Sequence, residues 1–261
     1  MPESGTFAFN HWSRGSGDVP GGDWSRGSGD VPSGDDAQVK LSRIGRSGVT
    51  VIRVDNVLRD PDGVAALGFT QTYAQDRSNL YPGMRAPMPA TFSTALRAWL
   101  TPILRHHGVL AGQEVLSRDS SFFSVVTTAA RDLLPIQRIP HYDSTDPKLL
   151  AAVIYLCDTR FSGTSFYRHR RTGYEEITLE NRNNYQVALD HDMRVQGPPR
   201  REYMNGDNSL FEVIFANELK FNSAIIYPGR VLHAGNIARQ FEPPKDASEW
   251  RLTVTALLEV A

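Results

Sequence analysis

The pattern of apolar positions changes near Ile44 and predicts a mainly β domain that begins with helices. Residues 49–54 (Val-Thr-Val-Ile-Arg-Val) are β-branched and partly alternating, which is typical of a strand. A helix is expected over 60–73, because Asp-Pro at its start supplies a cap and a first-turn proline. A second helix is expected over 91–107, since Gly108 follows as a natural C-terminal cap.

Beyond the helices, short apolar runs are separated by glycine and proline turns. We expect strands over 122–128, 136–139, 149–157, 163–167, 185–189, 224–227, 231–233 and 251–258. A helix over 209–218 is expected within a long charged stretch, 168–220, which we interpret as an insert near a barrel mouth. Short strands of this kind predict a sandwich or jelly roll, with the two leading helices packed on one outer face.

The first 45 residues differ in composition from the rest. The nonapeptide Trp-Ser-Arg-Gly-Ser-Gly-Asp-Val-Pro occurs at 12–20 and again at 24–32. A segment so rich in glycine, serine and aspartate buries too little apolar surface to offset its ordering entropy. We therefore expect a flexible tail over 1–45, with a docking element as the alternative. A single domain is expected over 46–261, its N-terminal part helical over about 58–108.

Composition and charge narrow the class of protein. The formal net charge is −1, so no global field favours nucleic acid or a membrane surface. The single cysteine, Cys157, excludes an internal disulfide and is expected to be a buried thiol. These features fit a reducing, cytoplasmic setting. No apolar run approaches the roughly 20 residues that span a membrane.

A histidine-aspartate triplet suggests a metal site. In an extended segment, His141 and Asp143 point the same way, so both can bind one ion. His233 follows an apolar strand and a Pro-Gly turn, which suits a third ligand. Two imidazoles and one carboxylate are the facial set of non-haem Fe(II) oxygenases. The other interpretation of the triplet is a polar turn, because turn-forming residues surround it.

The last strand carries an arginine in an alternating pattern. Arg251, Thr253 and Thr255 share one face of the strand, while apolar residues occupy the other. A guanidinium that points into a β-sandwich is costly without an anion, and its planar fork suits a carboxylate. We therefore expect Arg251 and Thr253 to bind a carboxylate co-substrate. The alternative is an arginine that reaches solvent at the start of a strand.

These residues resemble the signature of Fe(II)/2-oxoglutarate-dependent dioxygenases, H-x-D, H and R-x-S/T, across about residues 118–260. Tyr155 within Ile-Tyr-Leu, and the turn at 162–167, resemble the prolyl-hydroxylase-like branch, although Ser162 stands where glycine is usual. The segment Tyr81-Pro-Gly-Met-Arg85 resembles small bacterial members. The spacing between the last histidine and the arginine is longer than is common in the family.

The resemblance implies a double-stranded β-helix, or cupin-type jelly roll, with flanking helices. It implies Fe(II) held by His141, Asp143 and His233, and 2-oxoglutarate that chelates iron and meets Arg251, assisted by Thr253 and Tyr155. With O2, the co-substrate would yield succinate while a substrate C–H bond is oxidised.

The expected substrate is a small, amino-acid-like, carboxylate-bearing molecule, with no nucleic acid or membrane partner; a homodimer stays open. Tyr81 and Arg85 are expected in a lid that holds the substrate carboxylate, and Arg168, directly after a strand, is expected to reach the cavity. His169 and His191 lie in charged surroundings and are expected to be solvated or to face substrate. The expected outcome is hydroxylation, desaturation or ring closure such as cyclopropanation, in bacterial natural-product biosynthesis.

Two other functions stay open at this point. One is a metal-dependent cupin enzyme that does not use 2-oxoglutarate. The other is a non-catalytic binding module built on the same barrel.

Overall fold

A computed structural model describes residues 37–75 and 80–261. The duplicated nonapeptide, and most of the expected tail, lie outside these residues. The first strand, β1, spans Gln38–Ile44 and pairs along its length with β2, Val49–Asp55. β1 therefore lies within residues that were expected to belong to the tail, 1–45.

A seven-stranded antiparallel sheet forms the main layer, in the order β1-β2-β8-β5-β10-β4-β3. Its other strands are β3 (Gly83–Pro87), β4 (Leu116–Val126), β5 (Leu149–Tyr155), β8 (Ser223–Pro228) and β10 (Leu252–Val260). The last strand, β10, lies between β5 and β4 and pairs with both. The C-terminal strand is therefore central in this sheet.

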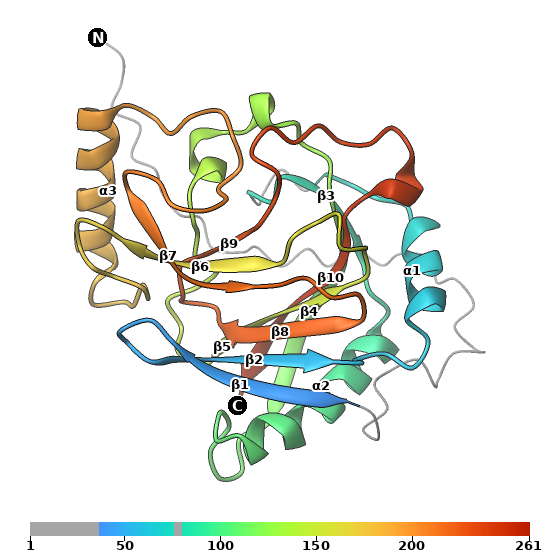
Figure 1. The fold of residues 1–261 in the computed structure, drawn as a ribbon. Coiled ribbons are helices and arrows are strands. Elements are labelled where there is room, and N and C mark those ends of the chain that lie inside the picture. The colour runs from blue at the N-terminus through green and yellow to red at the C-terminus, as the bar shows by residue number, and fades with distance from the viewer. Residues whose placement is uncertain (1–36, 76–79) are drawn as a thin grey trace.

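A smaller sheet lies across the large one (Figure 1). It has the order β7-β6-β9, with bounds Phe211–Asn217, Thr164–His169 and His233–Gly235. Phe166 of β6 packs edge-on against Tyr227 of β8, with 4.9 Å between ring centroids, so the two sheets face each other. The fold is mainly β, a cupin-type jelly roll with flanking helices, as expected.

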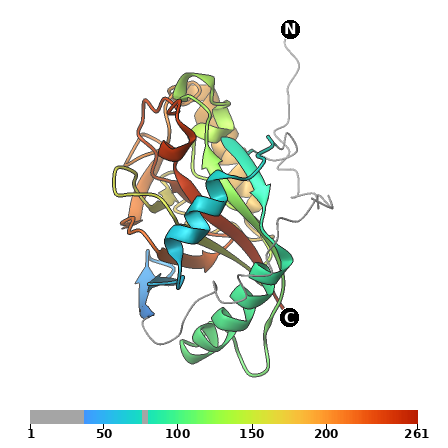
Figure 2. The ribbon, with the colours of Figure 1, turned by 90° about the vertical axis from the view of Figure 1, so that its right-hand side faces the viewer.

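The two leading helices cover the outer face of the large sheet (Figure 2). They are α1, Pro61–Phe69, and α2, Ala90–His106. Four side chains of α2 at four-residue spacing are buried there, namely Phe92, Leu96, Leu100 and Leu104. This periodicity of one helix face against apolar strands confirms the expected packing.

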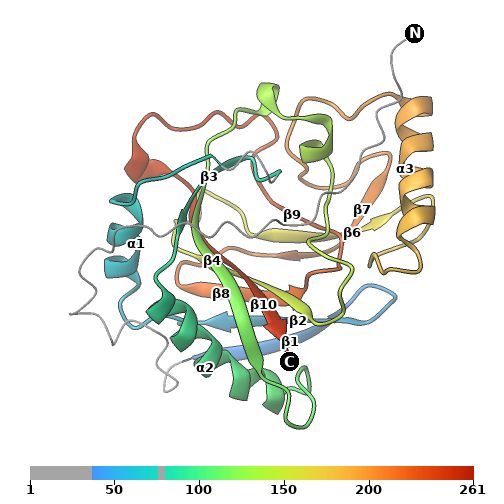
Figure 3. The same ribbon diagram turned by 180° about the vertical axis from the view of Figure 1, so that it is seen from behind.

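The described residues also form a third α-helix and three short 3-10 helices. The helix α3 spans Arg182–Gln196 and lies on the opposite side of the molecule from α1 (Figure 3). The 3-10 helices are η1 (Ala130–Asp132), η2 (Pro135–Arg138) and η3 (Ala247–Glu249). Among the described residues, none of the helices has the length and apolar character of a membrane span.

Three sequence predictions of secondary structure were wrong. Residues 136–139 were expected as a strand but fall in and beside η2. Residues 185–189 were expected as a strand but lie inside α3, where Tyr185 and Leu189, four apart, share the buried face. Residues 209–218 were expected as a helix but contain β7, whose aromatic and β-branched residues pair with β6.

Candidate active site

His141, Asp143 and His233 converge in one place, as their sequence pattern predicted. Each offers a ligand atom, and these three atoms lie within 4.8 Å of one another. The Nε2 atom of His141 is 3.8 Å from Asp143 Oδ1, and Nε2 of His233 is 3.7 Å from Asp143 Oδ2. The spacing suits three ligands on one face of a metal ion.

Backbone contacts hold the three ligands in position. His141 and His233 form an isolated antiparallel bridge, with N···O distances of 2.9 and 2.8 Å. The Asp143 amide donates to the Gly229 carbonyl at 2.7 Å. Nδ1 of His233 lies 2.9 Å from the Val231 carbonyl, and a proton on this nitrogen leaves Nε2 free for a metal. The donor set and its orientation therefore fit Fe(II).

The electrostatics of the site favour neutral imidazole at His141. Enclosure within the protein, together with the nearby His233 and Arg85, holds the pKa of His141 well below its usual value. Burial raises the pKa of Asp143, and the positive neighbours His233 and Arg85 oppose this effect. Half of the His141 side chain is accessible, and this residue borders the cavity described below.

Arg251 is buried between the two sheets. It precedes β10 and is only 5% exposed. Its Nη2 donates to the carbonyls of Ser162 and Gly163, at 3.1 and 3.2 Å. Within residues 37–75 and 80–261, its buried Nε has no hydrogen-bond acceptor. A buried guanidinium with donor capacity left over is suited to an anion.

Thr253 and Tyr155 lie beside Arg251 but have different surroundings. Thr253 lines the cavity, and its hydroxyl donates to the Ser124 carbonyl at 3.3 Å. Tyr155 is fully buried and its hydroxyl bonds to Thr164 Oγ1 at 2.8 Å. The Arg251 guanidinium carbon is 5.7 Å from the centre of the Tyr155 ring. Tyr155 thus packs behind Arg251 and is not among the cavity-lining residues that the structure describes.

Tyr81 and Arg85 reach the same site from β3 and the segment before it. The Arg85 guanidinium carbon lies 4.3 Å from the centre of the Tyr81 ring, a cation–π contact. Arg85 is close enough to His141 and Asp143 to act on both electrostatically. Both Tyr81 and Arg85 line the cavity. Arg85 belongs to β3 and pairs with β4, so it is part of the large sheet and not of a separate lid. Binding of a substrate carboxylate by Tyr81 and Arg85 stays a prediction.

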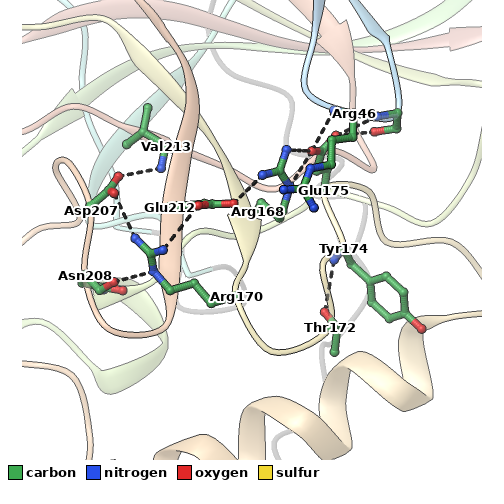
Figure 4. A network of polar contacts seen from close by, with 11 residues as sticks. Arg46, Arg168, Arg170, Thr172, Tyr174, Glu175, Asp207, Asn208, Glu212 and Val213 are labelled. Atoms are coloured by element: carbon green, nitrogen blue, oxygen red, sulfur yellow. Dashed lines mark hydrogen bonds and ion pairs between the residues drawn. The ribbon is translucent and has the colours of Figure 1, made fainter.

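Arg168 is placed elsewhere. Its guanidinium forms ion pairs with Glu175 and Glu212 (Figure 4), and it does not line the cavity. Glu175 also accepts hydrogen bonds from the backbone amides of Arg46 and Ser47 in the turn between β1 and β2. The expected substrate contact of Arg168 is not supported, because these carboxylates hold its side chain in a structural network.

Two other sequence expectations concern buried groups. His169, expected to be solvated or to face substrate, is fully buried, with Nε2 3.3 Å from Asp192 Oδ2 beneath α3. The charged residues beside His169 in the sequence suggested exposure, so its burial was not predicted. The expected buried thiol of Cys157 is confirmed.

The site residues surround a cavity of about 430 Å³. This volume is in the range of pockets that bind drug-sized molecules. Tyr227 forms part of the wall, and the lining also includes Asp143 and Arg251, so the triad and the arginine share one cavity. Sequence reasoning missed several lining residues, namely Gln137, Ile139, Arg182, Tyr203 and Met204. They come from irregular segments and helix ends, where no periodic signal marks an inward side chain.

Comparison with solved structures finds distant similarity. The epimerase SnoN from nogalamycin biosynthesis, described as non-heme and alpha-ketoglutarate-dependent, is 15% identical over 80% of this chain and 76% of its own, with a TM-score of 0.42. HygX from Streptomyces hygroscopicus, solved with nickel and 2-oxoglutarate, is 9% identical over 85% and 82%, with a TM-score of 0.40. These structures do not single out the prolyl-hydroxylase-like branch.

Comparison of the sequence gives a family. No curated protein matches the chain. Residues 35–258 match the family described as "Family of unknown function (DUF6445)". This match covers most of the chain, which therefore belongs to the DUF6445 family.

Proposed function

We propose that this protein is a non-haem Fe(II)/2-oxoglutarate-dependent oxygenase that oxidises a C–H bond of a small, carboxylate-bearing molecule. The observation that carries the proposal is the composition of one cavity. The cavity is lined by the His-Asp-His triad and by the buried Arg251. The Nε of Arg251 has no hydrogen-bond acceptor among the described residues. A short molecule with a carboxylate at each end could meet both.

Separate residues of this chain would bind the iron and the co-substrate. His141, Asp143 and His233 would hold the iron, with the Val231 carbonyl fixing the orientation of the last ring. Arg251 would pair with the distal carboxylate of 2-oxoglutarate. Its contacts with the carbonyls after β5 hold the guanidinium in place before the anion arrives.

Thr253 and Tyr155 would support this pairing in different ways. The Thr253 side chain lines the cavity, and its hydroxyl would turn from the Ser124 carbonyl to donate to the distal carboxylate. Tyr155 would act through packing, because its hydroxyl is already bonded to Thr164 and its ring lies behind Arg251. When bound, iron and 2-oxoglutarate would supply the activation of O2 and the oxidation of the C–H bond.

Arg85 would hold a substrate carboxylate in the cavity that the metal ligands line. Its guanidinium is fixed against the Tyr81 ring and lies within electrostatic range of two metal ligands. An anion bound here would share the cavity with the metal ligands, which would favour oxidation of one of its C–H bonds. Hydroxylation, desaturation and ring closure all begin at such a C–H bond.

The proposal is tested by calorimetric titration of the metal-free protein with Mn(II), a redox-inert substitute, and then with 2-oxoglutarate. We expect tight binding of 2-oxoglutarate to the metal-loaded protein and much weaker binding without metal. Equal affinity for 2-oxoglutarate with and without metal would contradict the proposal. Tight metal binding without any 2-oxoglutarate binding would instead favour a metal-dependent cupin enzyme of another type.

A further inference from the structure

The charges around the cavity are unequal. Among the lining residues that the structure describes are three arginines, Arg85, Arg182 and Arg251, and a single carboxylate, Asp143. In the proposed complex, the charges of ferrous iron and Arg251 are matched by Asp143 and the two carboxylates of 2-oxoglutarate. Arg182 then adds positive charge that neither the metal nor the co-substrate balances.

Arg182 stands at the mouth of this cavity. It is the first residue of α3, and its side chain is exposed. It lies within electrostatic range of Tyr142, which stands between His141 and Asp143 in the sequence. No ion pair or hydrogen bond engages its guanidinium among residues 37–75 and 80–261. The positive end of the α3 dipole adds to its field. An anion that enters the cavity is thus attracted at the mouth.

Among the described lining residues, no carboxylate other than Asp143 is present to pair with a cation. An α-ammonium group needs a carboxylate or several carbonyl oxygens to replace its hydration. The one described carboxylate of the lining, Asp143, is the metal ligand of the proposed site. A zwitterionic amino acid would therefore lose the hydration of its ammonium without an ionic partner in this part of the wall.

Apolar side chains line the entrance. Leu80 lines the cavity and is 49% exposed, and Leu134 nearby is 53% exposed. Gln137 joins the segments that carry them, because it accepts from the Leu134 amide and donates to the Leu80 carbonyl. Ile136 and Ile139 continue the apolar surface inward. These residues favour a substrate with an apolar body.

We propose that the primary substrate is an organic anion with an apolar body and no free ammonium group, and that Arg182 is a specificity residue for its carboxylate, together with Arg85. This inference rests on the proposed function and narrows the amino-acid-like substrate expected from sequence. N-acylated amino acids and simple carboxylic acids belong to this class, and free amino acids do not.

The test uses two sets of probes matched in shape. One set is 3-phenylpropionate, L-phenylalanine and 2-phenylethylamine, and the other is 4-methylpentanoate, L-leucine and 3-methylbutylamine. Each is titrated by calorimetry into the full chain loaded with Mn(II) and saturated with 2-oxoglutarate. Within a set only the charged groups change, so differences in affinity report the charge preference of the pocket.

We expect the acid of at least one set to bind about 10-fold or more tightly than its amino acid and amine. Arg182→Gln should weaken acid binding roughly 3–10-fold, as for an exposed ion pair at a mouth, with unchanged affinity for 2-oxoglutarate. Arg194→Gln, an exposed arginine in the last turn of α3, should change neither.

Three results would overturn the inference. They are equal or tighter binding of the amino acid or amine, unchanged acid binding in Arg182→Gln, and no acid binding by a protein that still binds 2-oxoglutarate. Absence of 2-oxoglutarate binding itself is a separate result. It would overturn the proposed function and the inference with it.

Discussion

His141 and His233, 92 residues apart in the chain, are joined by a reciprocal pair of backbone hydrogen bonds of 2.9 and 2.8 Å. Their ring centroids are 4.2 Å apart. The backbone pairing thus brings a residue of an irregular segment beside the first residue of β9 and points both imidazoles at Asp143. Preorganisation of this kind would let the proposed metal site form without rearrangement of the backbone.

The triad predicts the effect of removing one ligand. His233→Ala should weaken Mn(II) or Fe(II) binding by more than the roughly 10–100-fold that follows loss of an outer-shell partner. The measurement is calorimetric titration under nitrogen, with circular dichroism as the check of folding. His191→Ala is the matched control, because His191 is exposed and is not a lining residue. Unchanged metal affinity in His233→Ala would show that the metal site lies elsewhere.

The position of Arg251 predicts a selective loss of co-substrate affinity. Charge-assisted hydrogen bonds contribute about 1.5–3 kcal/mol, so Arg251→Gln should raise the Kd for 2-oxoglutarate roughly 10–150-fold. Metal binding should stay as in the wild type. Arg239→Gln, a change of an arginine outside the cavity, serves as the control. A wild-type Kd in Arg251→Gln would mean that another cation meets the distal carboxylate.

Glu175 predicts a component of acid stability. Hydrogen bonds from the turn between β1 and β2 and from Arg168 outweigh the opposing effect of burial and lower its pKa to about 2, from an ordinary 4.5. A depressed folded pKa stabilises the protein above about pH 4.5, and this contribution is lost as the pH falls toward 2. It amounts to about 3 kcal/mol.

The check is urea unfolding of the wild type and Glu175→Gln at several pH values. We expect the variant to be less stable near pH 6 and the difference to shrink as the pH falls below about 4.5. Gly45→Ala should destabilise the same contact, because Gly45 has φ of +64° and an added Cβ would lie 2.1 Å from a Glu175 oxygen. A difference between wild type and Glu175→Gln that is constant with pH would contradict the assigned pKa.

Cys157 should be unreactive in the folded protein. Burial is the main cause that raises the pKa of its thiol to about 11, so little thiolate is present near neutral pH. Treatment with iodoacetamide at pH 8, followed by mass spectrometry, should show almost no alkylation until a denaturant is added. Rapid alkylation of the native protein would show that the segment after β5 opens readily.

Sequence patterns with a clear local cause predicted much of this molecule. The period-two alternation of Arg251, Thr253 and Thr255 predicted a shared face, and all three line the cavity at the start of β10 or just before it. The spacing of His141 and Asp143 indicated a shared ligand position. Both depend on neighbouring residues alone. For this reason they could be recognised without knowledge of the tertiary structure.

Other features depend on contacts between distant segments. Tyr185 and Leu189 are four apart, and only packing beneath α3 distinguishes their helical face from a short strand. Arg168 was expected to reach the cavity, but ion pairs with Glu175 and Glu212 hold its side chain elsewhere. The position of Arg182 in the cavity wall also could not be predicted, because it depends on where the N-terminus of α3 lies in the fold.

The most direct test of the account is anaerobic optical titration of the metal-free protein with Fe(II) and then 2-oxoglutarate. We predict a weak visible charge-transfer band that appears only with both present, is absent in His233→Ala, and needs a higher concentration of 2-oxoglutarate in Arg251→Gln. A protein that binds Fe(II) tightly and gives no band at saturating 2-oxoglutarate would contradict the account.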